Sequence, residues 1–196
     1  MEASKLKLLQ DGNKLRKELN LVVRWRVLTS NGGKARIVAY QDARDYQKAL
    51  DYVCGPDHWE NEPMNLNGKM YMQVRIKIDD NWISKSDVGT ETSIESVKGE
   101  ASDAFKRACV VWGLFRDLYD YDYIVLDFDT RDKCPVTPDG IKLKTPDAIS
   151  TYCNGISKPM GSLINLYKTI GTNVVNENEQ LLNAFGVIKE YIKQNL

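Results

Sequence analysis

Hydrophobic residues recur at helical spacing over residues 98–112, where they form one continuous face. At about 100° per residue, one arc collects small and aromatic side chains, namely Ala101, Ala104, Phe105, Ala108, Val111 and Trp112. Lys106 and Arg107 lie on the opposite arc. Thr92 and Glu95 have the spacing of a capping box, which satisfies backbone N–H groups at a helix start. The pattern predicts an amphipathic helix that packs on a sheet and turns two adjacent cations outward.

Strand-like segments precede this helix and are separated by turn sequences. The segments are residues 21–29, 34–40, 59–66, 69–78 and 82–88. Asn31-Gly32-Gly33 separates the first two, and Asn67-Gly68 separates the next two. Such pairs favour the tight turns of antiparallel hairpins. The sequence therefore predicts two hairpins, the second of which continues into a third strand.

A helix over residues 44–53 is predicted between the two hairpins. The order β-β-α-β-β-β-α then predicts an α+β fold, in which an antiparallel β-meander is covered on one face by the long amphipathic helix. The leucines of residues 4–19 predict one or two short helices ahead of the first strand.

The pattern changes after residue 119. Residues 123–128 predict a short strand, and residues 130–160 hold four prolines among polar residues, which is typical of a loop-rich connector. Helical spacing returns near the end of the chain, over residues 161–170 and 177–196. We therefore expect a core over residues 1–129, followed by a connector and a helical C-terminal extension over residues 130–196.

The composition excludes some classes of protein. With 42% hydrophobic residues in 196, the chain is long enough for a real core. It has 27 basic and 27 acidic residues, so any binding of nucleic acid must come from a local cluster of cations. Cys54, Cys109, Cys134 and Cys153 form no CxxC pair, and with the single His58 they make no zinc set. We expect reduced, buried thiols in a cytoplasmic protein without a secretion signal or membrane span.

Two features of the sequence suggest enzymatic activity. Asn31 to Ala35 superficially resembles a phosphate-binding loop but lacks its glycine spacing and its Ser/Thr after lysine. A metal-dependent nuclease is suggested by the acidic residues near the helix start, Asp87, Glu91, Glu95, Glu100 and Asp103. Glu95 and Glu100 are about 140° apart on a helix, so they do not converge on one ion. Capping, solvation and salt bridges to neighbouring cations explain these acids better. We predict no catalytic residue, no metal and no cofactor.

Four blocks of sequence occur in a characteristic order and spacing. They are Arg24-Trp25-Arg26-Val27, Ala39 to Asp45, Leu50 to Gly55 with Trp59, and Trp82 to Gly89, which leads into the helix. Together they resemble the Rad52/Sak family of single-strand annealing proteins, found in eukaryotes and widely in phages. The resemblance covers residues 20–120 and no part of the last third of the chain.

The resemblance implies a DNA-binding inner groove. In the family, cations at the positions of Arg44, Lys106 and Arg107 hold the single-strand backbone with its bases outward, and we group Lys98 with them. One turn later the eukaryotic relatives carry another arginine where this chain has Val110, which removes one expected phosphate contact. A candidate second DNA site combines cations of the meander, Arg75, Lys77 and Lys85, for which a solvated strand face is an equal alternative.

The expected function is ATP-independent binding and annealing of single-stranded DNA in recombination and repair, without enzymatic activity. The partners implied are single-stranded DNA, further copies of the chain in a ring, and a single-strand-binding protein or exonuclease; a phage protein would act in the bacterial host cytoplasm. Residues 4–19 are our candidate for joining neighbouring subunits. The alternatives are a nuclease or other DNA-processing enzyme, and a protein that protects DNA ends without annealing them.

Overall fold

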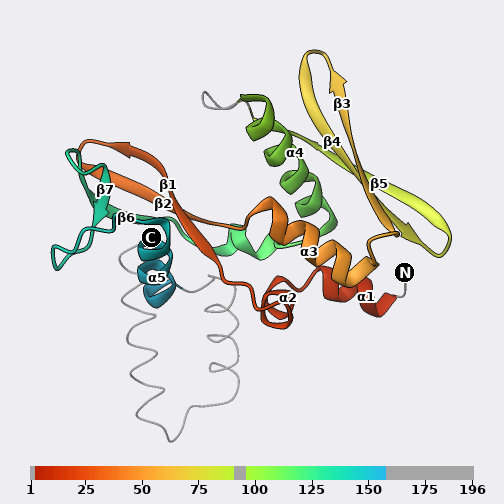
Figure 1. Cartoon of the computed structure of the whole chain (residues 1–196), viewed down its shortest axis with the longest axis horizontal. Coiled ribbons are helices and arrows are strands. Elements are labelled where there is room, and N and C mark those ends of the chain that lie inside the picture. Colours follow the sequence, from red (N-terminus) through yellow and green to blue (C-terminus); the bar gives the residue numbers. More distant parts are fainter. Residues whose placement is uncertain (1–2, 91–95, 158–196) are drawn as a thin grey trace, which may run out of the picture.

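A computed structural model describes residues 3–90 and 96–157 of the chain (Figure 1). These residues form an α+β fold, as the order of elements predicted, and their strands make two antiparallel sheets. The three-stranded sheet lies on one side of the molecule and the four-stranded sheet on the other, with short helices between them.

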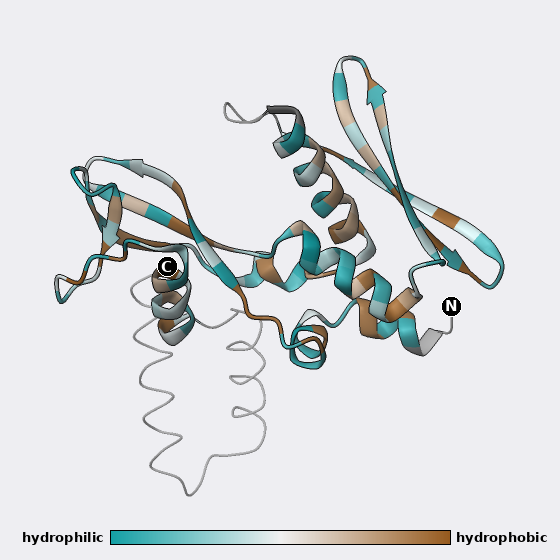
Figure 2. Ribbon diagram, in the orientation of Figure 1, coloured by the Kyte–Doolittle hydropathy of each residue, from teal (hydrophilic) through white to brown (hydrophobic). Residues whose placement is uncertain are grey.

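The three-stranded sheet is the predicted meander. It consists of β3 (Trp59–Leu66), β4 (Lys69–Ile78) and β5 (Asn81–Val88), paired in that order. The long helix α4 (Ser96–Trp112) packs against β4 and β5. Hydrophobic and hydrophilic residues mix along these strands (Figure 2), because only one face of the sheet is covered.

The predicted apolar arc of α4 is the face that packs on the meander. Its buried members are Ala104, Phe105, Ala108 and Trp112. The Trp112 indole N–H donates to the carbonyl oxygen of Val74 at 3.0 Å inside this contact. Gly89 allows the close approach, since a Cβ there would lie 2.5 Å from the carbonyl oxygen of Glu100. Val111 was wrongly assigned to the buried arc, because its side chain is 38% exposed.

The first hairpin does not join the meander. β1 (Arg24–Asn31) and β2 (Lys34–Tyr40) form a separate sheet with β6 (Ile124–Asp129) and β7 (Cys134–Val136), in the order β1-β2-β6-β7. The free edge of β2 pairs with β6, a strand far along the chain. The meander covered by α4 therefore contains three of the predicted strands, and the remaining two belong to the second sheet.

The expected loop-rich connector contains regular structure instead. β7 extends the first sheet, and α5 (Pro146–Ile156) packs on β1. The Trp25 indole N–H donates to Asn154 Oδ1 at 2.8 Å across this contact. Thr145 caps α5, and Pro146 occupies its first turn, where a proline lacks no hydrogen bond. The prediction of a connector was wrong here, whereas the division of the chain at residue 129 stays a prediction.

Four short helices lie between the sheets. They are α1 (Ala3–Leu9), α2 (Gly12–Glu18), α3 (Ala43–Cys54) and the 3₁₀ helix η1 (Arg116–Asp120). Leu9 and Leu15 are fully buried, and the buried Arg16 forms an ion pair with Asp117 of η1. Residues 4–19 therefore contribute to the core of their own chain, and a role for them in joining neighbouring subunits stays a prediction.

Some predictions fall on residues that the structure does not describe. The capping-box pair Thr92 and Glu95 and the helices expected over residues 161–170 and 177–196 lie outside the described residues.

Candidate functional site

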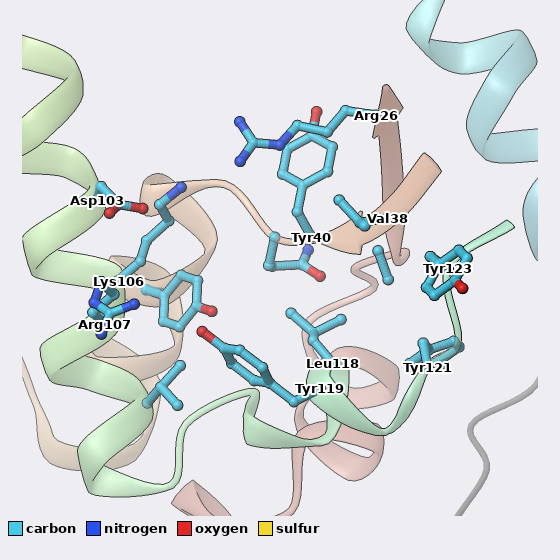
Figure 3. A pocket seen from close by; sticks show the side chains of 14 residues that line it. Arg26, Val38, Tyr40, Asp103, Lys106, Arg107, Leu118, Tyr119, Tyr121 and Tyr123 are labelled. Atoms are coloured by element: carbon cyan, nitrogen blue, oxygen red, sulfur yellow. The ribbon is translucent and has the colours of Figure 1, made fainter. Parts of the chain in front are cut away.

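A cleft of about 360 Å³ lies between α4 and the first sheet. Asp103, Lys106 and Arg107 line it from α4, and Arg26 and Tyr40 line it from the sheet (Figure 3). The remaining lining residues are mostly aromatic or apolar, namely Val38, Ala39, Gln41, Tyr46, Val110, Leu118, Tyr119, Tyr121 and Tyr123. The cleft thus combines cations with a wall rich in tyrosine.

Lys106 is the cation most enclosed by this cleft. Its side chain is half-buried, and it forms no ion pair among the described residues. Burial first, and then the positive charge of Arg26, lower the pKa of Lys106 below its usual 10.5, against the opposing effect of Asp103 and Asp42. Two cations therefore face one cleft without full neutralisation by acids, which favours binding of an anion.

Arg107 extends from α4 toward the meander. Its Nη2 lies 3.2 Å from Asp87 Oδ2 of β5, so this carboxylate partly neutralises the guanidinium. The Nε of Arg107 is buried and has no hydrogen-bond partner among the described residues. Arg107 therefore lines the cleft with a guanidinium that Asp87 fixes at one end.

The sheet side of the cleft pairs cations with aromatic rings. The guanidinium of Arg26 lies over the Tyr40 ring, 5.4 Å from its centroid. Beside the cleft, Arg36 lies over the Tyr123 ring at 4.3 Å. These arginines and tyrosines were not predicted as site residues. The signal was present in the alternation of β1 and β2, which places Arg26, Arg36 and Tyr40 on one face.

Gln41 adds an unused acceptor to the cleft wall. Its side chain is 1% exposed, and its Nε2 donates to Asp45 Oδ2 at 2.8 Å and to the Val22 carbonyl oxygen at 3.1 Å. These two bonds fix the orientation of the amide, because a flipped amide would oppose oxygen with oxygen. Its Oε1 has no hydrogen-bond partner within the described part of the chain.

The predicted inner-groove residues are only partly brought together. Lys106 and Arg107 line the cleft, whereas Arg44 and Lys98 do not. Arg44 is exposed at the start of α3 and has no ion pair among the described residues. Lys98 is exposed near the start of α4.

The predicted second set of cations lies on two different faces of the meander. Register places Lys85 opposite the buried Val74, and its Nζ donates to the Val111 carbonyl oxygen at 3.2 Å near the end of α4. Arg75 points to the other face and pairs with Glu60 at 2.6 Å. Lys77 shares that face and pairs with Asp80 at 3.3 Å. The three cations therefore do not form one surface.

The described acids near α4 contact neighbouring groups. Besides its pairing with Arg107, Asp87 accepts from the Val88 N–H at 2.7 Å. Glu100 accepts from the Met70 N–H at 3.3 Å, and Asp103 accepts from the Thr90 N–H at 3.1 Å. The other two acids weighed for a nuclease, Glu91 and Glu95, lie outside the described residues.

Within residues 3–90 and 96–157, no group of three or more His, Cys, Asp or Glu side chains is placed to hold a metal ion. Cys54, Cys109, Cys134 and Cys153 are all buried, as expected. None of the described helices is long and apolar enough to span a membrane.

Comparison with known proteins identifies the family. The model of the Rad52/22 family of double-strand break repair proteins matches residues 10–131, which is more than half of the chain. The chain therefore belongs to this family, and the resemblance seen in the four sequence blocks is confirmed.

Two curated relatives are similar over much the same length. Both are named single-stranded DNA-binding protein DdrA, one from Deinococcus deserti and one from Deinococcus radiodurans. The first is 33% identical over 120 residues, 59% of this chain and 59% of the relative. The second is 33% identical over 117 residues, 58% of this chain and 56% of the relative. The match thus spans little more than half the length of either relative.

Proposed function

We propose that this chain binds single-stranded DNA, with the phosphate backbone held in the cleft between α4 and the first sheet. The observation that carries the proposal is the geometry of the cleft, in which the half-buried Lys106 of α4 and Arg26 of the first sheet face one another across the same cavity. Burial and Arg26 also lower the pKa of Lys106. Bringing a phosphate between these two cations would offset both effects, because it restores the lost solvation of the ammonium and separates the like charges.

The family and the relatives support this choice of ligand. A protein of zero net charge has no general attraction for nucleic acid, so its binding depends on a local cluster such as this one. Both Deinococcus relatives are named for binding single-stranded DNA. Arg107, which lines the cleft and is only partly neutralised by Asp87, would supply a second phosphate contact. Arg44 and Lys98 stay candidates for contacts where the strand leaves the cleft.

The finer activity we propose is annealing of complementary strands in recombination and repair. Holding a backbone on fixed cations extends the strand, so that a second strand can be tested for pairing without ATP. One subunit offers few phosphate contacts, and a ring of identical subunits would repeat them along one strand at high effective concentration. The ring is an expectation from the resemblance, as are a single-strand-binding protein or an exonuclease as partners.

An annealing assay separates the three functions considered. Complementary oligonucleotides are mixed with the protein without ATP or divalent metal, and both duplex yield and strand length are measured. We expect faster duplex formation with full-length strands. Strands shortened once metal is added would favour a nuclease, and tight binding without faster annealing would favour a protein that only protects DNA.

A further inference from the structure

The open face of the first sheet carries alternating cationic and aromatic side chains. Arg26 lies over Tyr40, and Arg36 lies over Tyr123, so that two arginine–tyrosine stacks stand on the same face. The other face bears Trp25, which is fully buried against α5. One side of the sheet is thus part of the core, while the other presents flat π-systems outward.

This face is exposed, and of its three arginines in β1 and β2 within the described residues, Arg24 pairs with Asp42 and Asp45 whereas the other two are not neutralised. The side chain of Tyr123 is 53% exposed, and that of Val125 beside it is 52% exposed. Neither Arg26 nor Arg36 forms an ion pair among the described residues. Farther along the same face, Lys34 Nζ pairs with Asp127 Oδ1 at 2.7 Å. An exposed surface with free cations and flat rings suits a ligand that has both negative charge and aromatic faces.

The face is continuous with the proposed phosphate site. Arg26, Tyr40 and Tyr123 belong to the cleft wall opposite Lys106 (Figure 3), and Tyr119, which is 69% exposed, also lines the cleft. The buried Gln41 Oε1 adds an unused acceptor, which matches the N–H donors on base edges. A strand held at Lys106 would therefore have aromatic surface within reach on the sheet side.

We propose that Tyr40 and Tyr123, with the arginines stacked on them, form a base-stacking platform for the strand whose backbone is held at Lys106. The proposal rests on the single-strand binding proposed above and specifies its second component. Proteins that bind single strands without sequence preference combine cations with aromatic surfaces, and each stacked base improves affinity roughly five- to 150-fold. Duplex DNA is disfavoured here, since its bases already stack on one another. Bases that lie inward on this sheet also differ from the outward-facing bases implied by the resemblance.

The test compares an ordinary oligonucleotide with an abasic one of equal length, which keeps the phosphates but lacks the bases. We expect the intact protein to bind the abasic strand at least tenfold more weakly. Tyr123→Leu, and separately Tyr40→Leu, should weaken binding of the ordinary strand and reduce the preference for it, with unchanged salt dependence. Tyr52→Leu is the matched control, because Tyr52 is also 53% exposed but lies on α3 away from the cleft.

Each contrary result has a distinct meaning. Equal affinity of the intact protein for both strands, with no effect of Tyr123→Leu, overturns the platform and leaves the phosphate site intact. If the intact protein binds neither strand, the proposed function itself fails. If Tyr123→Leu alters the particle mass in light scattering but not the affinity, the face is an interface between copies of the chain and the platform is wrong.

Discussion

Replacing Trp112 by phenylalanine tests whether this residue supports the fold or contacts DNA. Trp112 is 3% exposed, and its indole N–H donates to the Val74 carbonyl oxygen at 3.0 Å between α4 and β4. The Lys85 ammonium lies 4.5 Å from the centroid of the ring. These contacts predict a structural role, which Trp112→Phe should weaken without removing the aromatic ring.

The magnitude follows from the buried hydrogen bond. Leaving a buried polar group without its partner costs about 1–3 kcal/mol. In a protein of this length, each kcal/mol lowers the thermal midpoint by about 2–4 °C. Trp112→Ala, which also opens a cavity, should cost about 3–5 kcal/mol. Denaturant unfolding followed by circular dichroism measures both variants, and the folded Trp112→Phe protein should keep its affinity for single-stranded DNA within about twofold.

Trp82→Phe provides the control. Trp82 lies on the uncovered face of the meander, where its side chain is 40% exposed beside Arg75. Its replacement should change the free energy of unfolding by less than about 0.5 kcal/mol. A Trp112→Phe protein that is as stable as the intact chain but binds DNA more weakly would refute the structural assignment and make Trp112 a stacking residue.

Two further predictions concern Gly89, which lies against α4, and Lys106 within α4. Gly89→Ala should destabilise the protein by about 1–3 kcal/mol, because its Cβ would lie 2.5 Å from the Glu100 carbonyl oxygen; Gly155→Ala, with no atom within 4 Å of its Cβ, should stabilise α5 by about 0.5–1 kcal/mol. Equal changes in the thermal midpoints of the two glycine variants would contradict the steric argument. Burial and Arg26 lower the pKa of Lys106 in the free protein, and a bound phosphate would raise it. Lys106 therefore takes up a proton when DNA binds, so the affinity should weaken as pH rises through the lowered pKa. Lys106→Arg should remove this dependence in titrations between about pH 7 and 10, and parallel profiles would oppose it.

Local signals in the sequence were sufficient to predict most of the individual helices and strands. Asn67 and Gly68 both adopt positive φ in the second hairpin, as a tight turn between antiparallel strands requires. The 3.6-residue period predicted α4 and most of its buried face, because packing on one sheet selects one stripe of side chains. Thr145-Pro146 was also a local signal, for the start of α5, but the prolines around it were interpreted only as breakers.

The same local signals could not predict which strands pair when they lie far apart in the sequence. The division into two sheets depends on the contact of β2 with β6, and no local pattern reports which edge a distant strand will pair with. The separation of Lys85 from Arg75 depends on the register between β4 and β5. For the same reason the sequence indicated Lys106 as a site residue but not Tyr119 or Arg26, which reach the cleft from other elements.

The salt dependence of single-strand binding tests the phosphate site most directly. The cleft variant carries Lys106→Ala and Arg107→Ala. The control variant carries Lys142→Ala and Lys144→Ala, which removes the same amount of charge. Both control lysines pair with Asp132, and neither lines the cleft. We predict that the cleft variant, folded by circular dichroism, binds at least tenfold more weakly at moderate salt. The slope of log affinity against log salt concentration should be shallower by about 1.4 for this variant, because each of the two lost phosphate contacts contributes roughly 0.7. The control variant should keep the slope of the intact protein. Equal slopes and affinities for the two double variants would contradict the account.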